Sequence, residues 1–283
     1  MVTTRLDPTL QTALEHAVRS ALEEDIGAGD LTASLIPADQ MAEASIVCRE
    51  AAVICGIPWV DACFQAVDPG THIDWLVSEG DKVQADQTLC RIRGRARALL
   101  TAERCALNFL QLLSGTATAT RAYVDAIAGT GSRILDTRKT LPGHRLAQKY
   151  AVTVGGGMNQ RLGLYDGILI KENHIAAAGG IAQALAAARA MDKTVPIQIE
   201  VESLDELKHA LEAGAEMILL DNFDLDTLRA AVRLNAGRAV LEASGGVNMA
   251  HVREIAATGV DRISIGSLTK HLKAVDLSMR FST

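Results

Sequence analysis

Apolar residues recur at helical spacing near the start of the chain and at strand-like spacing after it. Residues 8–24 predict an amphipathic helix with one apolar stripe. That stripe consists of Leu10, Leu14, Val18 and Leu22. Residues 44–95 contain short β-like runs separated by Gly, Pro and Asp, which predict a sheet of several short strands. Residues 99–113 are apolar on most sides and predict a buried helix.

From residue 133 onward the pattern alternates between strand and helix. Six apolar runs predict strands: 132–136, 166–170, 196–201, 216–221, 238–243 and 261–266. Helical patterns separate them, over 145–152, 179–191, 203–215, 224–237 and 248–259. Two of these helices have good N-caps, because Ser203 has Glu206 three residues on and Asp224 precedes a second acid. This alternation predicts a parallel sheet covered by helices, either doubly wound or a barrel.

Polar or small residues follow every one of the six predicted strands. The ends are residues 136–139, 171–174, 200–202, 221–222, 244–246 and 264–267. Functional side chains at the carboxyl ends of many strands are typical of a barrel with its active site on that face, and glycine-containing late ends favour a phosphate site. A closed barrel needs eight strands, so six predict an open or irregular barrel.

Composition narrows the class of protein. The 283 residues are 48% hydrophobic and 22% charged, values typical of a globular protein. The net charge of −6 argues against general nucleic-acid binding. No apolar run is long enough to span a bilayer and no secretory signal is recognisable, so we expect a cytoplasmic location and no membrane partner. The five cysteines lack metal or disulfide spacing and are interpreted as small buried apolar residues.

The acidic chain contains a local concentration of basic residues. Between Arg133 and Arg161 there are six Arg or Lys and one acid. A solvated basic face explains any single member, and for Arg145 and Lys149 that interpretation stays open. Positive charge gathered at strand ends instead indicates a ligand with several carboxylates or phosphates. Acids at neighbouring strand ends, Glu200 and Asp221 among them, would hold Mg²⁺ on a substrate or stabilise developing positive charge.

Seven strings identify a family more closely than these patterns do. They are EEDIGAGDLT (23–32), TAERCALNFLQLLSGTAT (101–118), DTRKTLPGHRLAQKYAVTVGGG (136–157), RLGLYDGILIKENH (161–174), EVES (200–203), LDNF (220–223) and ASGGVN (243–248). In order and spacing they resemble quinolinate phosphoribosyltransferases, nearly end to end. DTRKT with a downstream KENH is the most specific pair.

The resemblance implies an α/β fold with an N-terminal α/β sandwich and a C-terminal open, incomplete α/β barrel. We expect the sandwich over 1–115, the barrel over 116–270, and a segment 271–283 that packs back on the N-terminal domain. The family works as a homodimer whose active site is shared between subunits, and higher assembly is left open. The reaction implied converts quinolinate and phosphoribosyl pyrophosphate, with Mg²⁺, into nicotinate mononucleotide, pyrophosphate and CO₂, a step of NAD biosynthesis.

Site residues follow from the same motif match. Arg104 should reach the quinolinate carboxylates from the neighbouring subunit, and Arg138 and Arg161 should clamp them. Lys139 and Lys171 should face the phosphoribosyl donor. Glu200 and Asp221 should face its ribose and, indirectly, the metal of Mg-pyrophosphate, so that Lys139, Glu200 and Asp221 form the catalytic set. The remaining expected substrate contacts are Thr137, Gln160, Ser244, Gly245, Gly246, Ser264, Ile265 and Gly266.

One position departs from the family pattern. The family usually has His before the second clamp arginine, and this chain has Gln160. Glutamine can donate a hydrogen bond to a carboxylate but supplies neither a proton nor a charge. We predict that activity survives, because the surrounding cationic residues are retained. An inactive wild type made active by Gln160→His would contradict this.

Three other functions remain as alternatives. A related phosphoribosyltransferase would act on nicotinate or another pyridine or azole acid. A catalytically idle descendant would bind anionic metabolites as a regulator. An ordinary phosphate-binding barrel aldolase or isomerase would use Lys171 as a base or Schiff-base amine, which borohydride trapping would reveal.

Overall fold

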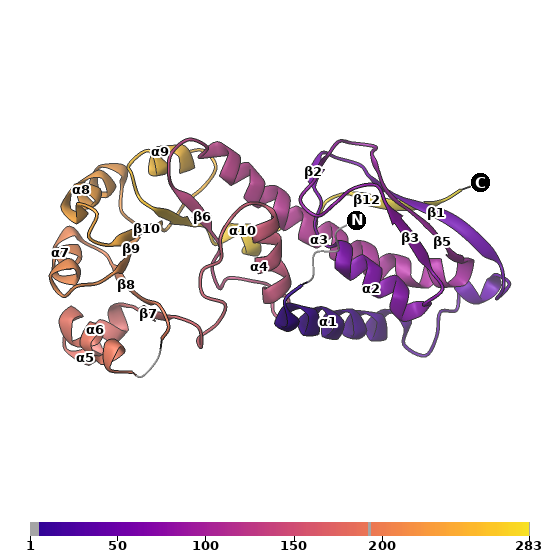
Figure 1. Cartoon of the computed structure of the whole chain (residues 1–283), viewed down its shortest axis with the longest axis horizontal. Helices are drawn as coiled ribbons and strands as arrows, with labels where there is room; N and C mark the ends of the chain where they lie inside the picture. The colour runs from indigo at the N-terminus through magenta and orange to yellow at the C-terminus, as the bar shows by residue number, and fades with distance from the viewer. Residues whose placement is uncertain (1–5, 192–193, 283) are drawn as a thin grey trace. The chain divides into compact units, whose positions relative to one another are not determined.

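The computed structural model describes residues 6–191 and 194–282, and the chain forms two compact units. The first combines the chain up to Ala119 with Thr140–Gly155 and the segment from His271 onward. The second combines Thr120–Lys139 with Gly156–Lys270. Figure 1 labels the helices and strands of both units. Residues 1–5 and 283, which the predicted domain ranges include, lie outside the described residues.

The described residues of the first unit form two small antiparallel sheets, four helices and a 3₁₀ turn. Its four-stranded sheet has the order β12-β1-β5-β3, formed by β1 (Met41–Cys48), β3 (His72–Trp75), β5 (Thr88–Arg95) and β12 (Leu277–Phe281). Strands β2 (Ala52–Val53) and β4 (Lys82–Val83) pair separately. The helical elements are α1 (Pro8–Ile26), η1 (Ala33–Leu35), α2 (Ile57–Val67), α3 (Ala96–Ala126) and α4 (Arg145–Val154). The end of α3, from Thr120 on, belongs to the second unit.

The first helix confirms its prediction, and the second was missed. Helix α1 buries the four stripe residues and begins at Asp7, whose carboxylate accepts from the backbone N–H groups of Thr9 and Leu10. Helix α2 lies inside the stretch that was predicted to form strands. Its Pro58 stands in the first helical turn, where proline costs no hydrogen bond, and Gly56 at its N-cap has φ 117°.

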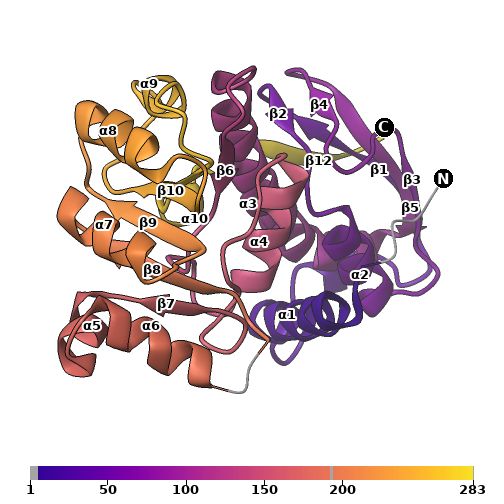
Figure 2. The same cartoon turned by 60° about the vertical axis from the view of Figure 1, so that its left-hand side comes forward.

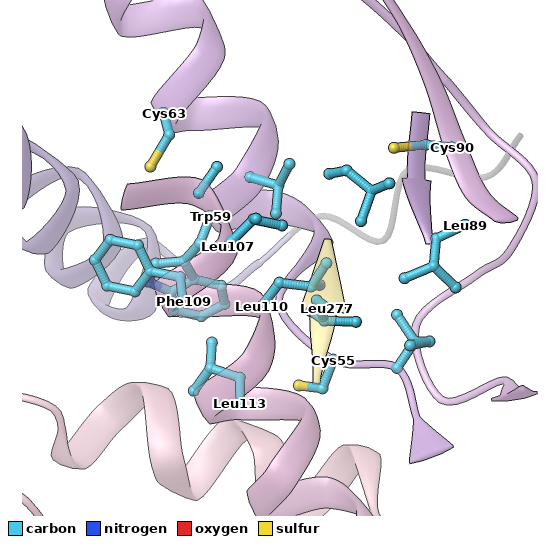
Figure 3. Packing of buried hydrophobic residues seen from close by; sticks show 14 of the residues in the cluster. Cys55, Trp59, Cys63, Leu89, Cys90, Leu107, Phe109, Leu110, Leu113 and Leu277 are labelled. Atoms are coloured by element: carbon cyan, nitrogen blue, oxygen red, sulfur yellow. The ribbon is translucent and has the colours of Figure 1, made fainter. Parts of the chain in front are cut away.

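The core of the first unit is apolar and contains all five cysteines. Figure 3 shows Cys55, Cys63 and Cys90 among leucines of α3 and the ring of Trp59. The five thiols are free and buried, which confirms their interpretation as small apolar residues. Desolvation raises the pKa of Cys63 and of Cys90 to about 12, so both are protonated at neutral pH.

The second unit is built on a six-stranded parallel sheet with the order β6-β11-β10-β9-β8-β7. All six predicted strands are confirmed: β6 (Arg133–Leu135), β7 (Ile168–Ile170), β8 (Ile197–Val201), β9 (Met217–Asp221), β10 (Val240–Ser244) and β11 (Arg262–Ser264). The helices are α5 (Glu172–Ala178), α6 (Ile181–Ala190), α7 (Leu204–Glu212), α8 (Leu225–Asn235), α9 (Val252–Ala256) and α10 (Ser267–Lys270). Among the described residues β6 and β7 do not pair, so the barrel is open, as expected.

The two faces of this sheet differ in chemistry. Alternate residues of the strands, such as Ile199, Ile218 and Leu241, pack in one apolar cluster with residues of α6 to α9. In Figure 2 these helices lie along one side of the strands. The intervening residues face the opposite, inward side, where Glu200 and Glu242 flank Leu219 in register. The sheet therefore presents polar groups inward and apolar groups to its helices.

Two segments that follow α3 in the sequence belong to the first unit. Strand β12 pairs antiparallel with β1, from Ala44 opposite Phe281 to Cys48 opposite Leu277. Thr140–Gly155, which the sequence pattern places in the barrel, packs with the first unit. Among the described residues no helix has the length and apolar character needed to cross a membrane.

Candidate active site

The carboxyl ends of β7 and β8 carry an ion pair. The Nζ of Lys171 lies 2.7 Å and 3.0 Å from the two carboxylate oxygens of Glu200. Glu200 is buried, whereas the Lys171 side chain is 45% exposed. His174 fixes the start of α5, since its Nδ1 accepts the backbone N–H of Lys171 at 3.0 Å. The pair thus places a partly accessible ammonium group at the strand ends.

The next two strand ends, of β9 and β10, are joined by close backbone contacts. Asp221 lies opposite Ser244 in the sheet, and Asn222 Nδ2 donates to Asp221 Oδ2 at 2.8 Å. The backbone N–H of Asn222 donates to the carbonyl of Ser244 at 2.9 Å. A side chain on Gly245 would come within 2.1 Å of Asn222 Oδ1, and its φ is 97°. Only glycine fits at this position, which keeps Asp221 and the Ser244–Gly246 turn together.

The ends of β6 and β11 also lie side by side. Thr137 Oγ1 accepts the backbone N–H of Lys139 at 3.1 Å, and the Lys139 side chain passes close to the Cα of Gly266. Ser264 is buried at the end of β11, and its Oγ has no hydrogen-bond partner among the described residues. Ile265 is not brought to this edge. Its side chain packs in the apolar cluster, and its N–H donates to the carbonyl of Leu135.

Arg138 and Arg161 are close enough to affect each other electrostatically. Burial, and after it the positive charge of Arg138, lowers the pKa of Arg161. The Arg161 guanidinium donates to the carbonyl of Gly167 at 3.0 Å. Two guanidinium groups held near one another repel, and an anion between them would remove that cost.

Gln160, the residue that departs from the family pattern, is fixed by three strands. Its backbone N–H donates to Oδ1 of the buried Asp136 at 2.9 Å. Its side-chain Nε2 donates to Gln198 Oε1 at 2.7 Å and lies 2.9 Å and 3.0 Å from the two oxygens of Glu242. Its Oε1 accepts the backbone N–H of Arg161 at 3.0 Å. Both the nitrogen and the oxygen of the side-chain amide therefore already have hydrogen-bond partners.

The structure brings most of the predicted second-unit residues to one edge of the parallel sheet. Arg104 belongs to the first unit and is exposed on α3. Lys149, left open between a ligand contact and a solvated face, is 1% exposed on α4 and so does not lie on a solvated face.

Sequence reasoning missed three residues that support this edge: Asn222, Gln198 and Glu242. Asn222 stands in the LDNF string but received no role. Gln198 and Glu242 lie in runs that were interpreted as continuously apolar, in which period-two alternation would have assigned them to the inward face.

The donor set limits how a metal ion could bind. Among the described residues no three His, Cys, Asp or Glu side chains gather as a metal site. Both Glu200 oxygens contact Lys171, whereas Asp221 Oδ2 accepts a hydrogen bond from Asn222. A Mg²⁺ ion that arrives on a phosphorylated substrate fits this arrangement better than a resident ion does.

Known proteins match the whole architecture. Residues 30–114 match the model of the quinolinate phosphoribosyl transferase N-terminal domain, and residues 116–280 match that of the C-terminal domain. The nicotinate-nucleotide pyrophosphorylase [carboxylating] of Mycobacterium leprae (strain TN) is 42% identical, with 94% of this chain and 96% of that protein covered. The quinolinate phosphoribosyltransferase [decarboxylating] 2, mitochondrial, of Nicotiana glauca is 38% identical, with 95% and 82% covered.

A solved structure agrees with these relatives. The nicotinate-nucleotide pyrophosphorylase from Francisella tularensis superposes with a TM-score of 0.94 at 45% identity, and the match covers 96% of each chain. Both family domains occur in order, and full-length relatives exceed 30% identity. The chain belongs to the quinolinate phosphoribosyltransferase family.

Proposed function

We propose that this protein transfers the phosphoribosyl group of phosphoribosyl pyrophosphate to quinolinate with decarboxylation, which gives nicotinate mononucleotide, pyrophosphate and CO₂. The observation that carries the proposal is the Lys171–Glu200 pair beside Asp221 at the carboxyl ends of three adjacent parallel strands. Carboxylates at this edge can stabilise positive charge at a sugar carbon, and the ammonium group can face an anion. The family membership names the two substrates.

The acceptor binds through arginines. Quinolinate carries two carboxylates, and Arg138 and Arg161 supply two guanidinium groups whose mutual repulsion a dianion relieves. Their planar forks match carboxylate geometry, so they also orient the pyridine nitrogen toward the sugar. Binding thus contributes by holding the reacting atoms in line.

The donor binds on the acidic side of the edge. Lys139 faces the pyrophosphate, while Glu200 and Asp221 face the ribose. Asp221, next to the Ser244–Gly246 turn, would approach the Mg²⁺ that accompanies the pyrophosphate. This ion supplies charge neutralisation of the leaving group. Backbone N–H groups of the turn, together with Gly266, hold the 5′-phosphate, because glycines at φ 97° and 60° allow a phosphate to approach the chain.

The chemistry requires little covalent participation by the protein. Departure of pyrophosphate from C1 gives the sugar oxocarbenium character, which the carboxylates of Glu200 and Asp221 stabilise. The pyridine nitrogen then forms the bond to C1. The resulting pyridinium ring withdraws electrons, so the adjacent carboxylate leaves as CO₂ and its bonding electrons remain on the ring carbon. That carbon then takes up a proton from solvent, which gives nicotinate mononucleotide. A trapped covalent ribosyl-enzyme would contradict this proposal.

A turnover assay tests the function. Purified protein, Mg²⁺ and phosphoribosyl pyrophosphate are incubated with quinolinate or with nicotinate, and nicotinate mononucleotide and CO₂ are followed. Product and CO₂ from quinolinate alone would support the proposal and show that Gln160 is compatible with activity. Turnover of nicotinate instead would favour the related phosphoribosyltransferase, and binding without turnover of either acid would favour the regulator.

We propose further that the enzyme acts in the cytoplasm as a homodimer in which Arg104 completes the partner's site. Arg104 is exposed on α3, as a residue that crosses to another subunit must be. Mixing refolded Arg104→Ala and Glu200→Gln subunits should then restore about a quarter of wild-type activity, because each mixed dimer regains one intact site. An Arg104→Ala protein that no partner rescues would show that Arg104 acts within its own subunit or not at all.

A further inference from the structure

Gln160 has no N–H left for a substrate. Its Nε2 carries two hydrogens, of which one is directed to Gln198 Oε1 and the other is shared by the two oxygens of Glu242. Its Oε1 can only accept, and it already accepts from Arg161. A carboxylate of quinolinate would therefore have to break an existing bond to be recognised by this amide.

The orientation of the amide is set from the sheet. Glu242 is fully buried, and its Oε2 accepts from Gln198 Nε2 at 3.0 Å. With its nitrogen held there, Gln198 presents its oxygen to Gln160, which in turn presents its own oxygen to the N–H of Arg161. A reversed Gln160 amide would face the Glu242 and Gln198 oxygens with another oxygen, which is unfavourable.

We propose that Gln198 and Glu242 are positioning residues of the quinolinate site, which act through Gln160 on Arg161. The chain of bonds runs from β10 through β8 to the backbone of the arginine that the function assigns to the carboxylate clamp. Gln160 then serves the site by holding Arg161 and does not contact the substrate. This inference rests on the proposed function for its substrate and on the hydrogen bonds for its geometry.

The proposal predicts that a substitution of Gln198 weakens the binding of quinolinate selectively. Gln198→Met keeps the size of the side chain but removes the acceptor and the donor, so Glu242 alone holds Gln160 Nε2 and the orientation of the amide is less tightly fixed. The KM for quinolinate should rise about tenfold, while kcat and the KM for phosphoribosyl pyrophosphate change less than about twofold. Met217→Leu is the matched control, since Met217 lines the same 360 Å³ cavity as Gln198 from the neighbouring strand and has no amide group.

A double-variant cycle tests whether the effect passes through Gln160. If it does, the Gln160→Met/Gln198→Met protein should bind quinolinate no more weakly than Gln160→Met alone. Additive losses would overturn the proposal. So would an equal loss in kcat and both KM values, which indicates general misfolding.

A crystal structure of Gln198→Met separates this inference from the proposed function. A turned Gln160 amide and a displaced Arg161 backbone would support the positioning role whatever the substrate. An unchanged Gln160–Arg161 contact would overturn it. If the wild type showed no turnover, the proposed function would be wrong. The crystal structure of Gln198→Met would still test whether Gln198 positions Gln160 and Arg161.

Discussion

The first unit buries apolar side chains and neutral thiols in its core, whereas the parallel sheet of the second unit buries Glu242, Gln198 and Glu200 on its inward face. Apolar burial needs only shape and volume, and it contributes mainly to stability. Buried polar groups must be matched bond by bond, and they fix the orientation of their neighbours. The difference teaches that equally buried side chains stabilise the fold where they are apolar and fix the orientation of their neighbours where they are polar, as on the inward face of the parallel sheet.

The largest loss of activity is expected for a substitution on the inward face of the parallel sheet. Glu200→Gln removes the charge that we propose faces the ribose, and it leaves Lys171 without its anionic partner. We expect kcat/KM to fall about a thousandfold, while the thermal midpoint changes little. Steady-state kinetics and calorimetry check the two parts. Glu212→Gln, which removes an exposed acid 3.9 Å from Lys208, is the control and should be near neutral. A large loss of stability in Glu200→Gln would remove the contrast between the units.

A substitution in the core of the first unit should instead lower the stability of the protein. Leu110→Ala leaves a void at a fully buried position (Figure 3) and should lower the free energy of unfolding by about 2–5 kcal/mol. Urea denaturation followed by circular dichroism measures this. Leu31→Ala is the matched control, because Leu31 is 87% exposed and should cost almost nothing. Equal costs for the two leucines would show that this core does not carry the stability of the unit.

The two glycines at the end of β10 sharpen the comparison, since both have a positive φ but only Gly245 is crowded by neighbouring atoms. In Gly245→Ala the new methyl group would meet both the side chain and the backbone of Asn222, so Asp221 must shift. We expect activity to fall about a hundredfold. Gly246→Ala meets no atom within 4 Å and adds only the strain of φ 60°, so its loss should be smaller. Initial rates at saturating substrate rank the two, and the reverse order would contradict this geometry.

The smallest effect concerns the buried thiols. The folded pKa of Cys63 and that of Cys90, each about 12, exceed the ordinary value of 9.0, so the folded state holds protons that the unfolded state loses as pH rises. The stabilising contribution is complete below pH 9 and declines between pH 9 and 12. At pH 10.5 we expect a loss of roughly 1–2 kcal/mol per thiol. Urea midpoints at pH 8 and 10.5 should differ less for Cys63→Ala/Cys90→Ala than for wild type. Identical differences would exclude these thiols as the cause.

The sequence predicts the parallel sheet well for a physical reason. A strand buried on one face by helices and crowded on the other is apolar over most of its length, and β7 to β10 have this pattern. The short β11 has only Ile263 as an apolar residue. The first unit is harder to predict, because the short apolar run of α2 fits a strand and a helix equally well.

Some features of the candidate site can likewise be predicted from the sequence and others cannot. Lys171, Glu200 and Asp221 directly follow or end apolar runs, so their strand-end positions can be inferred from the sequence. The bonds of Gln160 cannot, since its partners Gln198 and Glu242 lie 38 and 82 residues away along the chain. The parallel bridge between Leu135 and Met158 directs the chain toward them, and no local pattern indicates this bridge.

The pairing of β12 with β1 has a consequence for synthesis on the ribosome. Every strand of the parallel sheet precedes residue 271, whereas the four-stranded sheet requires Leu277–Phe281 to cover the free edge of β1. An uncovered strand edge can pair with other chains. The first unit therefore matures only after all strands of the parallel sheet have been synthesised, and its nascent form exposes β1 until Leu277–Phe281 have been added.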